Sequence, residues 1–306
     1  MSSVKRSVPR SARPRAKAAK IPPVPCVLAI GGLDPGGGAG ILADARAIHR
    51  AGAFACAAVA VLTVQSTSGM RAATPVTRRE LLAECTEVVK NQRVRAIKVG
   101  ALGAEENARA VGDFLAIHRD LPAVVDTVMI PTRGSARLLE ERAVATLRKR
   151  VLPHAALVTV NAPEAEVLTR LRVTRLDEAH DALLALLRLG CRAVLLKGGH
   201  LGGPQAVDLL AIAPSASSGS SSRNLRRPTA ASVIELSAPR LVMAPTHGGG
   251  CVLASLIAGR LAVEAKAYAA APSRVLAEAV RWAKDVHHEA LRNASDVGGD
   301  LRVLFV

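Results

Sequence analysis

The chain has 306 residues, half of them hydrophobic, and its 41 Lys and Arg against 25 Asp and Glu give a formal net charge of +16. The apolar content excludes a globally disordered protein, and no apolar run approaches the roughly 20 residues that cross a bilayer. The five cysteines are odd in number and widely spaced, which fits neither a disulfide framework nor a CxxC metal site, so we expect a cytoplasmic protein.

The positive charge is concentrated at the N-terminus, where residues 1–20 contain seven Lys or Arg and no acidic residue. Because prolines interrupt this segment, we predict that residues 1–24 form a disordered basic tail, with an address signal or an anion-binding arm as the alternatives. Only five residues are aromatic, so the chain lacks platforms for stacking on bases. We therefore expect no nucleic-acid partner.

Strands and helices alternate from Cys26 onward. An apolar strand at 26–30 precedes a glycine-rich loop at 31–40 and a helix at 41–51. The same patterns predict further strands at 54–63, 94–99, 123–129, 157–160 and 191–196, and helices at 77–91, 105–119, 136–150, 163–170 and 177–189. This alternation indicates βαβ units and a mainly parallel sheet.

The last third of the chain continues the pattern with shorter strands at 207–212 and 232–236, which flank a Ser-rich surface loop near 214–230. Helices are predicted from the THGGGC segment through residue 261 and at 272–292. Nothing marks an internal boundary, so we predict that residues 25–306 form one α/β domain, a single doubly wound sheet flanked by helices. Ligands of such sheets bind at the carboxyl ends of the strands.

The strongest motif is THGGGC, Thr246–Cys251, where a helix is predicted to begin. Gly248, Gly249 and Gly250 let the backbone approach a ligand closely, and successive amides at a helix N-terminus bind anions. A thiol in the first turn is expected to have a lowered pKa, which suits Cys251 as a base or nucleophile. A glycine turn followed by a buried cysteine is the alternative.

Two polar residues follow the first two strands. Asp34, within the glycine-rich loop, can meet a hydroxyl or an amine of a small substrate, and a turn in which it caps the next helix is the alternative. Gln65 offers a donor and an acceptor that match the edge of an aminopyrimidine, although a polar loop residue is equally compatible with the sequence.

Oxygen ligands follow two later strands. Asn161 and Glu164 present an amide and a carboxylate that suit Mg²⁺ bound through water, and a helix cap explains the same pair. Asp126, near the end of another strand, is a second candidate for the metal region. Lys197 can reach a phosphate as a point charge, with a surface turn as the alternative.

The segments GGLDPGGGAGILAD, NAPEAEVL, LLKGGHL and THGGGC occur in this order in one chain. Together they resemble the hydroxymethylpyrimidine and phosphomethylpyrimidine kinases of thiamine biosynthesis, members of the ribokinase-like superfamily. The resemblance implies ATP- and Mg²⁺-dependent phosphorylation of 4-amino-5-hydroxymethyl-2-methylpyrimidine and then of its monophosphate. It also implies that the pyrimidine and ATP are the partners and that the protein is a homodimer, and the lack of a long apolar run predicts that no membrane is involved.

The same resemblance implies roles for individual residues, position by position. Cys251 becomes the catalytic base, and the amides of Gly248, Gly249, Gly250 and Cys251 form the anion hole. The remaining implied contacts are Gly31, Asp34, Gln65 and Ala101 to the pyrimidine, Lys197 and Thr246 to the phosphates of ATP, and Asp126, Asn161 and Glu164 to the metal region.

The chain departs from the family pattern at several positions. Gly249 and Val252 stand where the family usually has threonines, Ala101 replaces a common methionine, residues 132–134 replace Lys-Ser-Gly, and residues 298–302 replace a Pro-His motif. Glycine keeps its N–H, so a backbone anion hole survives these changes. Two alternatives to the pyrimidine kinase therefore stay open, a catalytically weakened pyrimidine- or phosphate-binding regulatory homologue and a pyridoxal kinase.

Overall fold

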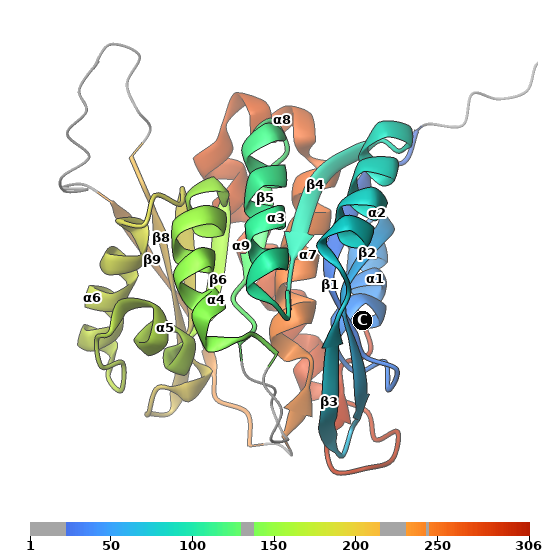
Figure 1. Ribbon diagram of the computed structural model, residues 1–306. Coiled ribbons are helices and arrows are strands. Elements are labelled where there is room, and N and C mark those ends of the chain that lie inside the picture. Colours follow the sequence, from blue (N-terminus) through green and yellow to red (C-terminus); the bar gives the residue numbers. More distant parts are fainter. Residues whose placement is uncertain (1–22, 130–137, 215–230, 243–244) are drawn as a thin grey trace, which may run out of the picture.

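The structure is a computed structural model that describes residues 23–129, 138–214, 231–242 and 245–306 (Figure 1). Most of the predicted basic tail, residues 215–230 of the predicted Ser-rich loop, and residues 132–134 lie outside the described residues. The division into a tail and one domain accordingly stays a prediction.

In the described part of the chain, nine strands form one sheet in the order β3-β2-β1-β4-β5-β6-β7-β8-β9. The six strands from β2 to β7 are parallel, whereas β3, β8 and β9 each run antiparallel to the strand before them in sequence. The strands are β1 (Cys26–Leu33), β2 (Phe54–Ser66), β3 (Gly69–Pro75), β4 (Val94–Val99), β5 (Ala123–Asp126), β6 (Leu157–Asn161), β7 (Ala193–Lys197), β8 (Gln205–Ile212) and β9 (Ser232–Pro239).

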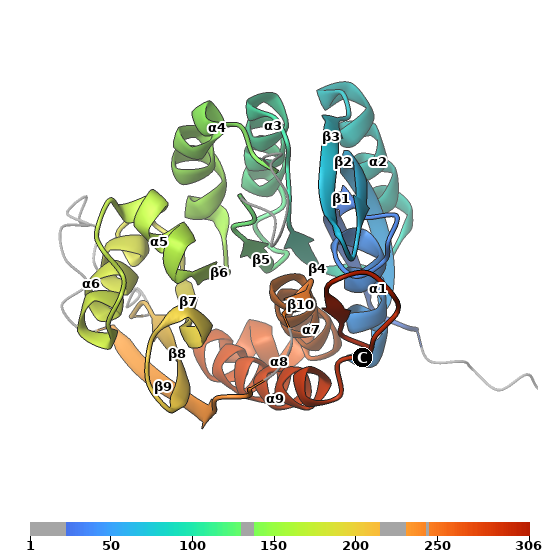
Figure 2. The same cartoon turned by 90° about the horizontal axis from the view of Figure 1, so that it is seen from below.

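Helices cover both faces of this sheet (Figure 2). One face carries α2 (Arg78–Asn91), α3 (Glu105–Ile117), α4 (Glu141–Thr146), α5 (Ala162–Thr169) and α6 (Leu176–Leu187), and the other carries α1 (Gly40–Arg50), α7 (Gly249–Val263), α8 (Ala265–Ala270) and α9 (Pro272–Arg292). The predicted fold class, a doubly wound and mainly parallel sheet flanked by helices, is confirmed.

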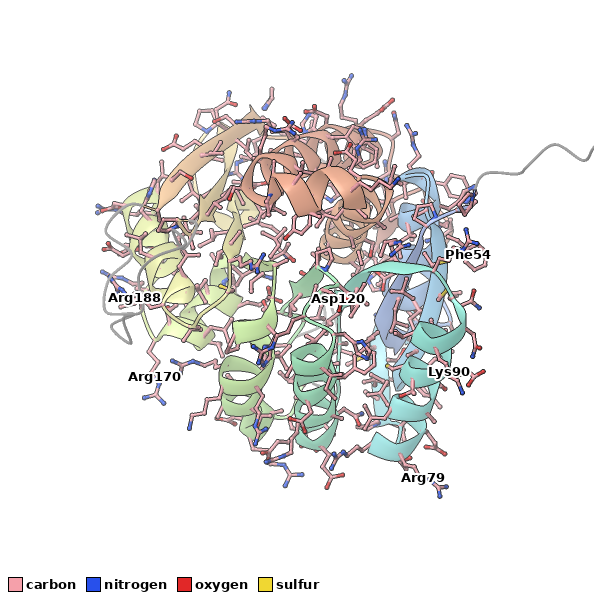
Figure 3. All side chains as sticks on the ribbon, turned by 90° about the horizontal axis from the view of Figure 1, so that it is seen from above. Phe54, Arg79, Lys90, Asp120, Arg170 and Arg188 are labelled. Carbon is pink, nitrogen blue, oxygen red and sulfur yellow. The ribbon has the colours of Figure 1, made fainter. Side chains whose placement is uncertain are left out.

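The strand β1 shows why the sheet is covered on both faces. Leu28 and Ile30 belong to the core under α2 and α3, while Val27 and Ala29 belong to the core under α1 and α7. Successive side chains of a strand point to opposite faces, so an uninterrupted apolar run needs a hydrophobic layer on each side. Charged residues occupy the outer surface, where Arg79, Lys90, Asp120, Arg170 and Arg188 are exposed (Figure 3).

Several predicted boundaries were wrong. The predicted loop at 31–40 begins too early, because Gly32 and Leu33 continue the ladder of β1 with β2. The predicted helix at 136–150 begins only at Glu141 and passes into a π-helical turn, Leu147–Val151, and a 3₁₀ turn, Leu152–His154. Strand 123–129 ends at Asp126, where Val128 N–H bonds back to the Asp126 carbonyl.

Several elements had no sequence prediction. The strand β3 returns antiparallel beside β2 as a hairpin, and a small second sheet joins β10 (Thr246–His247) to β11 (Arg302–Val303). The latter brings the C-terminal segment against the THGGGC motif. None of the helices in the described ranges combines the length and hydropathy that a membrane span requires.

Candidate active site

A cavity of about 570 Å³ lies at the carboxyl ends of the parallel strands, next to the N-terminus of α7. It is lined by every residue to which the resemblance assigned a catalytic, substrate, phosphate or metal role except Gly31, which is buried in β1 while its neighbour Gly32 reaches the cavity. The fold therefore gathers in one place side chains and backbone from both ends of the chain.

The glycines of the THGGGC motif set the backbone geometry of the predicted anion hole. Gly248 has a φ of +80°, and a Cβ there would lie 2.0 Å from the carbonyl oxygen of Gly38, so only glycine fits this position. The helix α7 begins at Gly249. The amides of Gly249, Gly250 and Cys251 are in the first turn, where N–H groups lack acceptors within the helix and favour an anion.

Cys251 sits in that first turn and is partly exposed to the cavity. Burial raises the pKa of its thiol to about 11, and the nearby Asp44 and Asp126 act in the same direction. The ammonium of Lys98 and a hydrogen bond from the Gly40 N–H oppose this shift without cancelling it. The expectation of a lowered pKa was therefore wrong for the empty site, because desolvation outweighs the helix terminus.

A buried ion pair beside the thiol was missed by the sequence analysis. Lys98, on β4, is 1% exposed and places Nζ 2.8 Å from both carboxylate oxygens of Asp44, on α1. Ser255 Oγ donates a third bond to Asp44 at 2.8 Å. The available signal was a single lysine inside the apolar strand 94–99, since an enclosed lysine needs a carboxylate partner.

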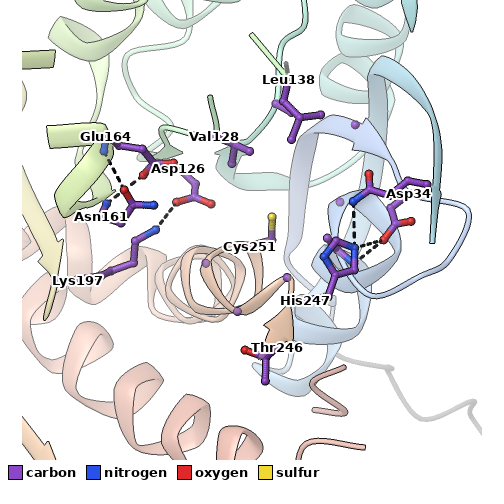
Figure 4. Close-up of a pocket in the computed structure, with 18 of the residues that line it drawn as sticks. Asp34, Asp126, Val128, Leu138, Asn161, Glu164, Lys197, Thr246, His247 and Cys251 are labelled. Atoms are coloured by element: carbon purple, nitrogen blue, oxygen red, sulfur yellow. Dashed lines mark hydrogen bonds and ion pairs between the residues drawn. The ribbon is translucent and has the colours of Figure 1, made fainter. Parts of the chain in front are cut away.

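On one side of Cys251 lie Asp34 and His247 (Figure 4), and Gln65 contacts His247 in the same cluster. His247 Nε2 is 2.9 Å from Asp34 Oδ2 and 3.1 Å from Gln65 Nε2. Asp34 also accepts bonds from the N–H groups of Gly36 and Ala39, both at 2.9 Å. Burial alone raises the pKa of Asp34, but the bonds from His247 and the two amides outweigh it and hold the pKa below its ordinary value.

These contacts bear on the two interpretations of Asp34. Its carboxylate already accepts three bonds from the protein, and the residue is 2% exposed. The turn of the alternative explanation is present, since Gly37 N–H bonds to the Asp34 carbonyl at 3.0 Å. The expected cap is not, because the carboxylate reaches the N–H of Ala39, the residue before α1, and the start of that helix has no side-chain cap bond. Asp34 in addition orients His247. His247 was part of the quoted motif but received no role from the sequence.

On the other side of Cys251 lies the predicted metal and phosphate region. Asp126 Oδ1 accepts a bond from Lys197 Nζ at 3.0 Å and one from Thr159 Oγ1 at 2.7 Å. Asn161 Oδ1 accepts from Glu164 N–H, and Glu164 Oε2 accepts from Asn161 N–H, so this pair forms the helix cap that was the alternative explanation.

The same residues also line the cavity, so capping does not exclude a ligand. Burial raises the pKa of Glu164 to about 7, and the charge of Asp126 adds to the increase although Lys197 opposes it. No group of three or more His, Cys, Asp or Glu side chains able to hold a metal occurs among the described residues. Two carboxylates and an amide nevertheless fit Mg²⁺, which keeps several waters and binds substrate phosphates.

A histidine from α9 also contacts the predicted anion hole. His287 Nε2 donates to the carbonyl of Gly249 at 2.9 Å, and burial lowers the pKa of His287 to about 4. Lys284, one turn earlier, pairs with Asp208 at 2.6 Å, and Asp208 accepts a bond from Gly198 N–H. The loop after β7 and the start of α7 are thus both tied to side chains of α9.

Comparisons with known proteins place the chain in a family. The family model described as Phosphomethylpyrimidine kinase matches residues 34–303. A hydroxymethylpyrimidine/phosphomethylpyrimidine kinase of Streptomyces coelicolor is 36% identical over 285 residues, covering 92% of this chain and 95% of the relative.

Solved structures show the same fold. A phosphomethylpyrimidine kinase of Clostridium difficile superimposes with a TM-score of 0.67 at 28% identity, covering 87% of this chain and 98% of that one. An ADP complex of a Bacillus subtilis pyridoxal kinase gives a TM-score of 0.76 at 23% identity, covering 92% and 97%. The second likeness concerns the fold alone.

Proposed function

The chain belongs to the phosphomethylpyrimidine kinase family, and from this premise we propose that it phosphorylates 4-amino-5-hydroxymethyl-2-methylpyrimidine and then its monophosphate in thiamine biosynthesis. The γ-phosphoryl group of ATP is the group transferred. The observation that carries the proposal is that one cavity brings together three sets of groups. They are the glycine amides and the thiol at the start of α7, the amide of Gln65 that matches the edge of an aminopyrimidine, and Lys197 with Asp126.

The protein's part in this reaction is positioning and electrostatic stabilisation. The substrate hydroxyl lies beside Cys251, its oxygen bonds to the γ-phosphorus, and the bond from that phosphorus to the β,γ-bridging oxygen breaks to release ADP. Sγ of Cys251 takes the hydroxyl proton, and the charge that develops on the phosphoryl oxygens is stabilised by the amides of Gly248 to Cys251. The Gly40 N–H and Lys98 favour the thiolate that this step requires.

We assign the phosphates of ATP to the side of the cavity that holds Lys197 and Thr246. Asp126, Asn161 and Glu164 would hold Mg²⁺ there, which supplies positive charge that neutralises the phosphates. Lys197 adds a fixed charge on the same side, and its bond to Asp126 keeps both side chains directed at the cavity. Support for ATP comes from membership of a kinase family.

The deciding experiment is an ATP-dependent assay of purified protein with the hydroxymethylpyrimidine, its monophosphate and pyridoxal, alongside Cys251→Ala. Turnover of the two pyrimidines above that of pyridoxal is the expected result. Preference for pyridoxal would instead identify a pyridoxal kinase. Binding of the pyrimidine without turnover of any substrate would identify the weakened homologue and overturn the kinase activity.

We further propose that the protein is a homodimer in a reducing cytoplasm. All five cysteines are free thiols. The hairpin of β2 and β3 lies at an edge of the sheet and exposes Leu62 and Val64, by 48% and 59%. Light scattering after size exclusion tests the dimer, and Leu62→Lys is expected to shift its mass toward that of a monomer if this hairpin is the interface.

A further inference from the structure

The two ring nitrogens of His247 have different surroundings. The residue is 4% exposed, and its Nε2 contacts Asp34 and Gln65. Its Nδ1 is enclosed and has no hydrogen-bond partner among the described residues. A buried polar atom without a partner costs free energy, and one that lines a ligand cavity recovers that cost when a ligand supplies the partner.

The bond to Asp34 decides which nitrogen carries the proton. Asp34 accepts bonds from two backbone amides, which hold it in the ionised form, so Nε2 must carry the hydrogen that it shares with this carboxylate. In the neutral imidazole, Nδ1 then carries a lone pair and is an acceptor. This is the arrangement in which a buried carboxylate sets the tautomer of a histidine.

The same bond frees the amide of Gln65. One ring nitrogen cannot donate to Asp34 and accept from Gln65 at once, and the charge-assisted bond to the carboxylate is the stronger of the two. Gln65 therefore meets Nε2–H with its oxygen, which leaves its N–H groups for a ligand. An N–H donor and the Nδ1 acceptor thus come from neighbouring side chains of one cavity.

Packing fixes the direction in which Nδ1 points. A Cβ on Gly38 would lie 2.4 Å from Cδ2 of His247, so the Cδ2 edge of the ring is pressed against the glycine-rich loop. Nδ1 is on the opposite edge of the ring and faces away from that loop. In Figure 4 the ring projects between Asp34 and Cys251, and His247 lines the cavity.

We propose that His247 is a specificity-determining residue, whose Nδ1 accepts a hydrogen bond from the exocyclic amine of the pyrimidine while a Gln65 N–H donates to the adjacent ring nitrogen. This inference rests on the proposed function, since it names the substrate edge that the same site reads. Asp34 is the positioning residue, because it holds His247 in the tautomer that accepts. The pair of side chains recognises an N=C–NH₂ edge, which presents one acceptor and one donor in the matching order.

The proposal predicts that the protein binds the 4-amino pyrimidine more tightly than an analogue in which the hydrogen-bond donor and acceptor of this edge are exchanged. In the 4-oxo analogue of the substrate the amine becomes a carbonyl and the ring nitrogen gains a proton, so both bonds are inverted. Losing a neutral hydrogen bond costs about 0.5–1.5 kcal/mol, or up to about tenfold in affinity, and facing two acceptors adds to this loss. The dissociation constant of the 4-oxo analogue is expected to exceed that of the 4-amino alcohol by about tenfold or more.

Calorimetric titration of the two alcohols without ATP measures this ratio in the full-length protein and in three variants. His247→Gln can still donate to Asp34 but has no acceptor at the place of Nδ1, and its ratio should fall toward one. His247→Asn keeps an acceptor near the place of Nδ1 and should retain the preference for the amine. In Asp34→Asn no carboxylate holds the proton on Nε2 of His247, so the proton can move to Nδ1. This variant should therefore lower the ratio of dissociation constants although His247 is intact.

A wild-type ratio in His247→Gln, with a melting temperature near that of the wild type, would overturn the inference. If that variant does not fold, an unchanged ratio in Asp34→Asn overturns it instead. The outcome is separate from that of the proposed function, which fails if wild-type protein with ATP phosphorylates neither the pyrimidine nor its monophosphate, whatever the two dissociation constants are.

Discussion

The ammonium of Lys98 and the carboxylate of Asp44 form an ion pair at 2.8 Å that is enclosed beside Cys251, although 54 positions separate the two residues in the chain. Such a pair contributes little net stability when complete, but removal of one partner leaves an uncompensated buried charge. The geometry therefore makes Lys98 and Asp44 dependent on each other and couples them to the thiol.

Lys98→Met is expected to destabilise the protein by about 3–5 kcal/mol, because it leaves Asp44 unpaired in the interior. Urea unfolding followed by circular dichroism measures the change. The double variant Lys98→Met with Asp44→Asn removes both charges and should recover part of the loss. If the double variant instead lost as much unfolding free energy as the two single variants together, Lys98 and Asp44 would not depend on each other for stability.

The reactivity of Cys251 should report its raised pKa. Since burial raises the pKa of this thiol to about 11, alkylation by iodoacetamide is expected to be slow at pH 7 and to accelerate as the pH approaches 11. The protein has five free thiols, and the alkylation that is absent from Cys251→Ala is the alkylation of Cys251. Rapid alkylation of Cys251 at pH 7, with a midpoint below 8, would contradict this account.

The same shift has a consequence for stability. The pKa of the folded state lies above the ordinary thiol value of 9.0, so the folded state prefers the protonated form. The stability that the folded state gains from the protonated Cys251 thiol is complete below about pH 9 and is lost as the pH rises toward 11. The pH dependence of the melting temperature over that range should therefore be less steep in Cys251→Ala than in the wild type.

Adjacent glycines of the anion hole should respond oppositely to substitution. Gly248→Ala places a Cβ 2.0 Å from the Gly38 carbonyl at a φ of +80°, and we expect loss of activity with a lower melting temperature. A Cβ at Gly249 meets no atom closer than 3.5 Å, from His287 Nε2, so Gly249→Thr should fold. Its hydroxyl adds a donor to the anion hole, and kcat is expected to rise by up to about tenfold.

The test of this pair is steady-state kinetics with thermal melting of both variants. A well-folded and active Gly248→Ala protein would show that the close approach to Gly38 is not required. A fall in kcat for Gly249→Thr, at unchanged melting temperature, would show that the glycine is preferred at this position.

Lys197→Met removes the cation that we assign to the phosphates. We expect kcat/KM for ATP to fall by about ten- to a hundredfold, since a hydrogen bond to a charged group is worth about 1.5–3 kcal/mol. Lys197→Arg keeps the charge and should retain more activity than Lys197→Met. Equal kcat/KM values for ATP in the wild type and Lys197→Met would place the phosphates elsewhere.

Much of the architecture followed from local sequence patterns. Apolar runs and helical spacing predicted the parallel strands and the long helix Pro272–Arg292 with its observed bounds, because hydrophobic periodicity reflects burial directly. The hairpin strand β3 was not predicted, since its exposed, Ala-rich residues carry little apolar pattern of their own. It exists because β2 offers a free edge to pair with.

At the site, residue types and motif positions predicted which chemical groups line the cavity, whereas packing sets the partners and protonation of those groups. Glycine motifs and polar residues at strand ends identified the cavity residues around Cys251, because chain geometry places strand ends at one edge. The bond from His247 to Asp34 joins residues 213 positions apart, and no local spacing encodes it. The pKa of Cys251 likewise depends on desolvation and on Lys98, which only packing across the sheet brings together.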